Sequence, residues 1–353
     1  MYRAVILLLL AAIQPPWRDA LPGYRYSFPR DHFEHPDFRT EWWYYTGNVW
    51  TADGRRFGFE LVFFREGDRS TPRTNPSPWR IDDIYFAHAA LTDATGRRFV
   101  SDERLNRGGP GIAGASFAQQ RIWNGNWFDI WRGEEQTLTA ATTDFHFTLS
   151  CSPAKPFVIE GENGVDQKSE GAGNASHYVS FPLLKVTGSI SNGGREYKVS
   201  GQAWMDHEWF SSALAGGQAG WDWFSIQLDN GTEVMLYQLR RKDRSADPYS
   251  SGTFIDRNGH ARHLRAADFR LTPGEVWKSP ATGARYPVTW TIGIPSLGLD
   301  LHCTPVLPNQ ELAVTRGPQY WEGAVNYNGS AHGVGYLEMT GYGKALGGSQ
   351  STE

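Results

Sequence analysis

The sequence predicts an all-β protein made of many short antiparallel strands. Aromatic residues make up 14% of the 353-residue chain, which also contains 39 glycines and 20 prolines. This mixture favours strands and tight turns over helices. Helical periodicity is nearly absent, and only residues 266–269 are expected to form a helical turn. The length exceeds what one hydrophobic core usually serves, so two domains or one duplicated architecture are expected.

The individual strands are predicted by runs that alternate apolar with polar residues, or that are rich in β-branched and aromatic residues. They cover residues 57–64, 84–91, 127–131, 145–151, 197–204, 224–228, 234–239, 288–292 and 333–340. Turns of the Asp/Asn-Gly type occur at Asp53-Gly54 and Asn230-Gly231. Such turns connect the two strands of a hairpin, so we expect antiparallel barrels or sandwiches.

The two cysteines occur in similar segments. Cys151 lies in FTLSCSPAKP and Cys303 in LDLHCTPVLP, which share the pattern apolar-x-apolar-x-Cys-Ser/Thr-Pro-x-x-Pro. Each segment is typical of a strand that prolines bring to an end. A chance similarity between two strand ends is one explanation, and an internal duplication of the chain is the one we favour. An exported protein can form a disulfide, but equivalent positions in two repeats need not lie close together.

The N-terminal residues 1–20 are expected to be a leader for export to the periplasm or the exterior. Arg3 precedes ten apolar residues, 4–13, a run too short to span a bilayer but typical of a signal peptide. No other apolar run approaches 18 residues, so we expect no transmembrane segment in the mature chain. The net charge of -4 and the lack of a basic run argue against a nucleic-acid partner.

Two nearby segments, Met205–Trp209 and Gly220–Trp223, combine tryptophans with three carboxyl groups and a histidine. An acid or an imidazole beside indole rings loses water contacts, and its pKa is displaced. Such a site suits an apolar substrate that must be protonated or deprotonated.

Four motifs now identify a family resemblance: EWWYYTG at 41–47, FGFELVFFR at 57–65, GQAWMDHEW at 201–209 and GWDWF at 220–224. Through them, residues 29–345 resemble the carotenoid 1,2-hydratase family, whose relatives include AttH-like proteins. The resemblance implies two consecutive lipocalin-like β-barrels with an aromatic ligand cavity. We place these barrels at residues 21–175 and 176–345, followed by a flexible tail at 346–353.

The family resemblance also implies an activity. Family hydratases add water to an isolated carbon–carbon double bond, which implies a cofactor-free enzyme that hydrates, isomerises or cyclises an apolar isoprenoid or polyene by acid catalysis. They carry a His-x-Trp pair, matched here by His207 and Trp209, and a Tyr-x-Asp pair. Tyr237 matches the second pair, but Leu239 stands where the aspartate would be. A carrier that binds a hydrophobic small molecule without turnover is the alternative.

Strand alternation assigns the candidate residues to faces. His207 and Trp209 share one face, which we expect to line a barrel, while Asp206 and Glu208 point the other way. Alkene hydration needs a protonated acid, for which Glu41 and Asp206 are candidates, and aromatic rings that stabilise a cation. We expect the site at the junction of the barrels, with catalytic roles for His207, Asp206, Glu41 and Tyr237 and substrate-binding roles for Trp209, Trp221, Trp223, Trp43 and Tyr45.

Other site chemistries find little support in the sequence. The adjacent Asp206, His207 and Glu208 alternate in direction along a strand and cannot share one ion, and no H-E-x-x-H motif occurs. No G-x-S-x-G nucleophile elbow and no phosphate-binding loop is found either. We therefore expect no metal and no cofactor.

Overall fold

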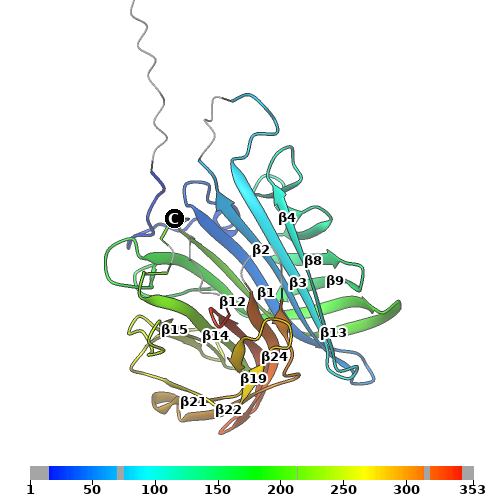
Figure 1. Ribbon diagram of the computed structural model, residues 1–353, viewed down its shortest axis with the longest axis vertical. Helices are drawn as coiled ribbons and strands as arrows, with labels where there is room; N and C mark the ends of the chain where they lie inside the picture. The colour runs from blue at the N-terminus through cyan, green and yellow to red at the C-terminus, as the bar shows by residue number, and fades with distance from the viewer. Residues whose placement is uncertain (1–15, 70–74, 213, 314–318, 344–353) are drawn as a thin grey trace, which may run out of the picture.

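The computed structural model describes residues 16–69, 75–212, 214–313 and 319–343. It consists of two antiparallel sheets, each curled into a nearly closed barrel, and the second lies below the first in Figure 1. Within the described ranges, helical structure is confined to the 3-10 helices η1 (Arg30–His32) and η2 (Pro295–Leu297). The predicted all-β fold of two consecutive lipocalin-like barrels is confirmed.

The first barrel is a 13-stranded sheet in the order β4-β3-β2-β1-β13-β12-β9-β8-β7-β6-β5, and β10 and β11 both pair with β12. Its strands are β1 (Thr40–Trp50), β2 (Arg56–Gly67), β3 (Asp83–Asp93), β4 (Arg98–Arg107), β5 (Ala113–Ser116), β6 (Arg121–Asn124), β7 (Trp127–Arg132), β8 (Glu135–Ala141), β9 (Phe145–Pro153), β10 (Val158–Ile159), β11 (Asp166–Gln167), β12 (Ala175–Asn192) and β13 (Arg195–Phe210).

The second barrel is a 10-stranded sheet in the order β17-β16-β15-β14-β25-β24-β22-β21-β18, with β23 paired to β24. Its strands are β14 (Gln218–Leu228), β15 (Glu233–Arg241), β16 (Ser251–Ile255), β17 (Ala261–Arg265), β18 (Arg270–Pro273), β21 (Trp290–Ile294), β22 (Leu299–Pro305), β23 (Glu311–Leu312), β24 (Tyr320–Gly329) and β25 (Gly333–Thr340). A separate hairpin pairs β19 (Val276–Lys278) with β20 (Arg285–Pro287).

The strand orders of the two barrels are equivalent. In each, the first strand (β1 or β14) lies between its hairpin partner (β2 or β15) and the last strand (β13 or β25). Continuing from the last strand, β12, β9, β8 and β7 correspond to β24, β22, β21 and β18. Cys151 on β9 and Cys303 on β22 therefore occupy equivalent strands, as the duplication explanation of their segments requires.

The division between the barrels differs from the boundary expected at residues 175–176. That boundary falls at the start of β12, and β12 and β13 both pair within the first sheet. The first sheet ends at Phe210 and the second begins at Gln218. The strand that carries His207 thus closes the first barrel against β1 and does not open the second.

The strands predicted from the sequence all occur, and 333–340 coincides with β25. The expected strand 288–292 begins two residues late, at Trp290. Gly54 and Gly231 adopt positive φ angles of 85° and 79° in the hairpin turns β1–β2 and β14–β15, a conformation that glycine adopts without steric cost. Residues 266–268 form a turn, closed by a hydrogen bond from the Asp268 amide to the Arg265 carbonyl.

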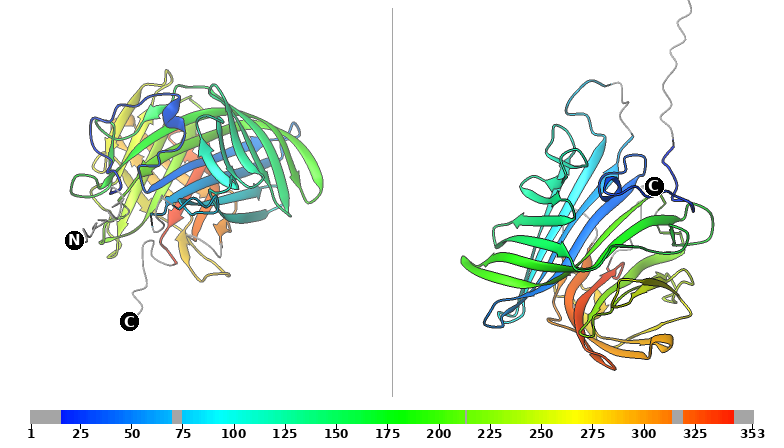
Figure 2. Two further views of the ribbon diagram at one scale, coloured as in Figure 1. Left: turned by 90° about the horizontal axis from the view of Figure 1, so that it is seen from above. Right: turned by 180° about the vertical axis from the view of Figure 1, so that it is seen from behind.

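Apolar side chains fill three regions. One core fills the first barrel around Trp43, Phe59 and Phe147, and a second fills the second barrel around Phe224 and Trp290. A third cluster lies between the barrels and takes residues from both sheets, including Tyr44, Trp204, Trp223, Tyr237 and Tyr336. Figure 2 shows the two curled sheets in contact from two further directions. The outer faces of the central strands are therefore buried as well as the inner ones.

The N-terminal segment packs against one end of the first barrel. Ala20 is buried and forms a bridge with Gly173, and the Arg18 amide bonds to the Asp37 carbonyl. The apolar run 4–13 of the expected leader and the expected tail 346–353 lie outside the described residues. In the described ranges, neither helical segment has the length and apolar character needed to cross a membrane.

Both cysteines are free thiols, fully buried in the cores of different barrels, so the disulfide considered from the sequence does not form. We predict that the native protein reacts slowly with a bulky thiol reagent and that the unfolded protein shows two reactive thiols, because burial raises the pKa of Cys151 and of Cys303. Thiol titration with and without denaturant measures this. Rapid reaction of native protein, or a mass lower by two hydrogens, would contradict it.

Candidate active site

Two neighbouring strands place the candidate residues. Strands β1 and β13 pair directly, so that Trp43 lies opposite His207 and Tyr44 lies opposite Asp206. Successive side chains of a strand point to opposite faces. Odd-numbered residues of both strands therefore face the interior of the first barrel, and even-numbered residues face the second barrel. Each face carries its own buried polar cluster.

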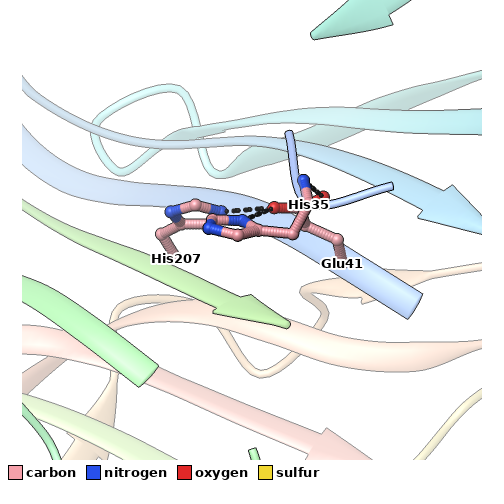
Figure 3. Close-up of side chains that lie close together, drawn as sticks. All are labelled: His35, Glu41 and His207. Carbon is pink, nitrogen blue, oxygen red and sulfur yellow. Dashed lines mark hydrogen bonds and ion pairs between the residues drawn. The ribbon is translucent and has the colours of Figure 1, made fainter. Parts of the chain in front are cut away.

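The interior cluster centres on the carboxylate of Glu41 (Figure 3). Its Oε1 atom accepts hydrogen bonds from His35 Nδ1 at 2.7 Å and from His207 Nε2 at 2.9 Å. Its Oε2 atom accepts from the His35 amide at 2.9 Å and from Arg65 Nε at 3.1 Å. All four side chains are buried, and Asp31 faces the far nitrogen of His35 at 3.4 Å. These contacts bind the N-terminal segment to the barrel.

The electrostatics of this cluster make Glu41 a carboxylate. Burial opposes its ionisation, but the charge of His35 and the hydrogen bonds from both histidines outweigh burial and lower the pKa of Glu41. Burial lowers the pKa of His207, against the opposing effect of Glu41, so this imidazole is neutral near pH 7. Burial also acts on His35, but the charge of Glu41 and the hydrogen bond to Asp31 raise the pKa of that imidazole. Neither Glu41 nor His207 is therefore a ready proton donor.

His35, Glu41 and His207 also meet the distance requirement for metal ligands, since one ligand atom of each lies within 4.8 Å of the others. The two imidazoles nevertheless direct their nitrogens at the same Glu41 oxygen (Figure 3), which sits where an ion would bind. The guanidinium of Arg65 holds the second oxygen. An ion would have to replace both histidine hydrogen bonds to Oε1 and would add positive charge beside Arg65, so the donor set fits a hydrogen-bonded ion-pair cluster better than a metal centre.

The second barrel repeats part of this arrangement. On β14, the buried Asp222 pairs with Arg240 Nε at 2.9 Å, as Glu41 of β1 pairs with Arg65. In both barrels the carboxylate lies on the first strand and the arginine on the second. The recurrence indicates that this ion pair belongs to the barrel architecture, while the two histidines are particular to the first barrel.

The even-numbered face of β13 contributes to a second cluster, which lies between the two sheets and combines acids and aromatic residues from both. We call it the inter-sheet cluster and define it by Asp206, Glu208, Tyr178, Trp204, Trp221, Trp223, Tyr237, Glu160, Glu60, Glu322, Glu338, Tyr44 and Lys168. Asp206 is 3% exposed and accepts three hydrogen bonds of 2.6 Å, from Tyr178, Ser180 and Trp204. Trp223 of the second barrel donates to the Tyr178 hydroxyl at 3.1 Å. The network therefore joins the two barrels.

A cation lies at one side of the inter-sheet cluster. Lys168 Nζ pairs with Asp166 at 2.7 Å and with Glu208 at 3.2 Å. It also lies 4.1 Å from the ring centroid of Tyr237, whose hydroxyl donates to Asp166 at 2.8 Å. Lys168 and Asp166 thus hold Tyr237 in place.

The carboxyl groups of the inter-sheet cluster favour the protonated form, except for Glu208, which pairs with Lys168. Burial raises the pKa of Asp206 to about 7, against the hydrogen bonds it accepts, and raises those of Glu160 and Glu338 to about 8. Burial also raises the pKa of Glu60 to about 8, and that of Glu322 rises further because Glu60 and Glu338 add their charges. These carboxyl groups between the barrels therefore hold protons near neutral pH, whereas Glu41 in the interior cluster does not.

The sequence prediction combined residues that the structure separates. His207, Trp209, Trp43 and Glu41 lie together inside the first barrel, where all four are fully buried, and Tyr45 lies further along the same face, bonded to Asp129. Asp206, Trp221, Trp223 and Tyr237 lie in the inter-sheet cluster. The two sets do not share one pocket, because β13 belongs to the first sheet and its odd-numbered face lies inside the first barrel, whereas Trp221, Trp223 and Tyr237 lie between the barrels. Asp206 and Glu208 face the second barrel rather than solvent.

Sequence reasoning missed Glu338 and Glu322. They are cross-strand neighbours on β25 and β24, and Glu338 also lies opposite Trp223. The sequence did contain one indication of Glu338. It is a carboxyl group between Leu337 and Met339 in a predicted strand, and a strand with apolar neighbours on both sides of a charged residue is expected to be buried on both faces.

Comparison with known proteins agrees with this architecture. The model of a family described as AttH-like matches residues 19–342. The chain belongs to the AttH-like family. An AttH protein of Nitrosomonas europaea has a structure with a TM-score of 0.83 and 34% sequence identity, covering 93% of this chain and all of the other. No curated protein matches the chain in sequence.

Two more distant structures share the fold. Kievitone hydratase of Nectria haematococca is similar with a TM-score of 0.68 and 14% identity, over 93% of this chain and 98% of the other. CghA in complex with Sch210972 is similar with a TM-score of 0.51 and 12% identity, over 86% and 89% of the respective chains. At these identities the likeness establishes only the shared architecture of the AttH-like chain.

We predict that Glu41→Gln lowers the free energy of unfolding by about 3–5 kcal/mol, because it removes the anion that pairs with both the buried Arg65 and the charged His35 and leaves Arg65 only its second partner, Asp83. Denaturant titration followed by tryptophan fluorescence measures this. Glu196→Gln on β13 is the matched control, since its pair with Lys198 is exposed and its removal should cost under about 1 kcal/mol. Equal losses in the two variants would contradict a structural role for the interior cluster.

A second prediction concerns the pH dependence of stability. The folded-state pKa values of Asp206, Glu160 and Glu338 lie at about 7 to 8, above those of free carboxyl groups. Their stabilising contribution is complete below about pH 4 and is lost as pH rises through about 7 to 8. Asp206→Asn should therefore flatten the pH dependence of the unfolding free energy by up to about 1.4 kcal/mol per pH unit between about pH 4 and pH 7, the interval between the unfolded and the folded pKa of Asp206. An unchanged slope in denaturant titrations would contradict a protonated Asp206.

Proposed function

We propose that this protein is a cofactor-free enzyme that protonates a carbon–carbon double bond of an apolar isoprenoid or polyene and thereby hydrates, isomerises or cyclises it. The reaction takes place between the two barrels. The observation that carries the proposal is the inter-sheet cluster, where carboxyl groups with raised pKa values lie among indole and phenol rings from both sheets.

Acid catalysis requires a donor that is still protonated at the working pH, and burial among apolar rings supplies one. Protonation of an alkene creates a carbocation, which each adjacent aromatic face stabilises by roughly 0.5–2 kcal/mol. Trp204, Trp223 and Tyr44 pack edge to face with ring centroids 5.2 and 6.2 Å apart. The cluster thus combines the two requirements at one place. In the interior cluster Glu41 is ionised and His207 is neutral, and the charged His35 is held between Glu41 and Asp31.

The family and fold neighbours support the same class of reaction. Kievitone hydratase shares the whole architecture, and its name describes the addition of water. The hydratase motif implied a catalytic role for His207. In this proposal carboxyl groups of the inter-sheet cluster, including Asp206 on the opposite face of the same strand, supply the proton instead. The other proposed residues, Tyr237, Trp221 and Trp223, line the inter-sheet cluster.

The alternative function is that of a carrier, which binds an apolar molecule without changing it. A carrier needs the aromatic residues of the cluster but has no use for protonated acids among them. Burying the six carboxyl groups of the inter-sheet cluster between two sheets lowers the free energy of unfolding. Their presence favours catalysis over simple binding.

We expect wild-type protein, incubated with acyclic isoprenoids and polyenes in deuterium oxide, to incorporate solvent deuterium into product, which mass spectrometry detects. Asp206→Asn should slow incorporation at least tenfold while tryptophan quenching still reports binding. His207→Gln is the matched control on the opposite face of β13, and its folded fraction should retain turnover.

Three outcomes separate the possibilities. Loss of turnover in His207→Gln but not in Asp206→Asn would move the active site into the first barrel. Quenching without label in every protein would make the protein a carrier. Turnover that depends on Asp206 supports the site between the barrels.

A further inference from the structure

Glu338 differs from the other carboxyl groups of the inter-sheet cluster in its exposure. Glu60, Glu322, Asp206 and Glu208 are at most 5% exposed, whereas Glu338 is only partly buried although it lies among them. Asp206 has both oxygens engaged by three donors, so it cannot reach a substrate without breaking that network. A proton donor must come within hydrogen-bond reach of the atom it protonates. Of these five carboxyl groups, only Glu338 is exposed enough for a bound substrate to reach it without a change in the hydrogen-bond network.

We propose that Glu338 is the acid that protonates the substrate, and that Trp221 and Trp42 flank the reacting double bond. This inference rests on the proposed function and specifies which residues perform it.

The position of Glu338 is fixed by its neighbours. On β25 it lies opposite Trp223 of β14 and Glu322 of β24, so all three side chains face the first barrel. Trp221 Nε1 donates to Glu338 Oε2 at 3.1 Å. The second oxygen is therefore the one that carries the proton. Because the hydrogen bond from Trp221 fixes the orientation of the Glu338 carboxyl group, the acid is positioned before a substrate binds.

Trp221, which bonds to this acid, belongs to an aromatic rim that we define by Trp42, Phe64, Phe210 and Trp221, all of which are partly exposed. The rim joins both barrels, since Trp42 of β1 stacks with Trp221 of β14 at 6.5 Å between ring centroids and 23° between planes. Phe210 and Phe64 lie 4.9 and 6.2 Å from Trp42. An unsaturated chain that binds at this rim therefore meets the rings of Trp42 and Trp221 next to the acid that Trp221 holds.

Charges around Glu338 hold its proton. Asp206 and Glu208 of β13 face it from the first sheet, and both raise its pKa, after the larger effect of burial. Glu322 faces it from β24, with Glu60 of β2 behind, and Tyr44 of β1 also lies within electrostatic range of this group. The cation Lys168 is neutralised by Asp166 and Glu208. Burial raises the pKa of Glu338 to about 8, so it is protonated at neutral pH.

The step balances without an oxidant or reductant. The π electron pair of the alkene forms a C–H bond with the Glu338 proton, the O–H bond breaks, and a carbocation faces a carboxylate. In isomerisation or cyclisation the cation later loses a proton to Glu338, which restores the acid. In hydration a water molecule forms the C–O bond and its proton returns to Glu338.

The test compares Glu338→Gln with wild type in the deuterium assay described above. We expect Glu338→Gln to lose about 10²–10⁴-fold in turnover while quenching by the same isoprenoid is retained. Trp221→Phe removes the hydrogen bond but keeps a ring, and should lower turnover less while changing its pH profile. Glu233→Gln, another carboxyl group with a raised pKa but paired with Lys155 away from the rim, is the control and should keep wild-type turnover.

The pH profile supplies a readout that a purely structural role would not change. Wild-type turnover should fall as pH rises through about 8, and Asp206→Asn should move this fall to lower pH because it removes a charge that raises the pKa of Glu338. Wild-type turnover that persists in Glu338→Gln would overturn the inference and leave the proposed function intact. No turnover by wild-type protein would overturn both.

Discussion

The alternation of side chains along β13, a strand buried on both faces, is the constraint on which the rest of the structure depends. One residue step, from Asp206 to His207, moves a side chain from the space between the barrels to the inside of one of them. Since both faces are buried, neither set of polar groups can turn to water. The polar groups on each face therefore find their hydrogen-bond and ion-pair partners on other strands. Because these partners differ, the carboxyl groups of the two clusters differ in protonation.

The contrast between Glu41 and Asp206 shows how partners decide protonation. Both carboxyl groups are buried and both accept several hydrogen bonds. Glu41 has a guanidinium and a charged imidazole beside it, so its ionised form prevails. Asp206 has neutral donors and a neighbouring glutamate, so burial prevails. The ionised Glu41 binds the N-terminal segment to the barrel through His35, and the protonated Asp206 lies beside the aromatic rings between the barrels.

The fold could be predicted from the sequence because strands and hairpins are indicated by patterns among residues that are close together in the chain. Asn-Gly and Asp-Gly turns specified hairpins, and the Cys-Ser/Thr-Pro segments revealed equivalent strands in the two barrels. Alternation also placed Glu41 with Trp43 correctly. It could not show which sheet β13 joins, because antiparallel pairing of β1 with β13 spans more than 150 residues of chain. Without that pairing, the sequence assigns His207 and Trp209 to the same site as Trp221, Trp223 and Tyr237, and it gives no reason to single out Glu338.

The duplication has a consequence for the origin of the site. The inter-sheet cluster uses the outer faces of the central strands of both repeats, so a single repeat would have presented Asp206 and its neighbours to water, where carboxyl groups titrate normally. An ancestor with one barrel could have shifted these groups only by associating with a second copy. Fusion of two copies would have made that association permanent and let each side diverge. Both repeats contribute an acid and a tryptophan to the interface, Asp206 and Trp204 from the first and Glu338 and Trp223 from the second.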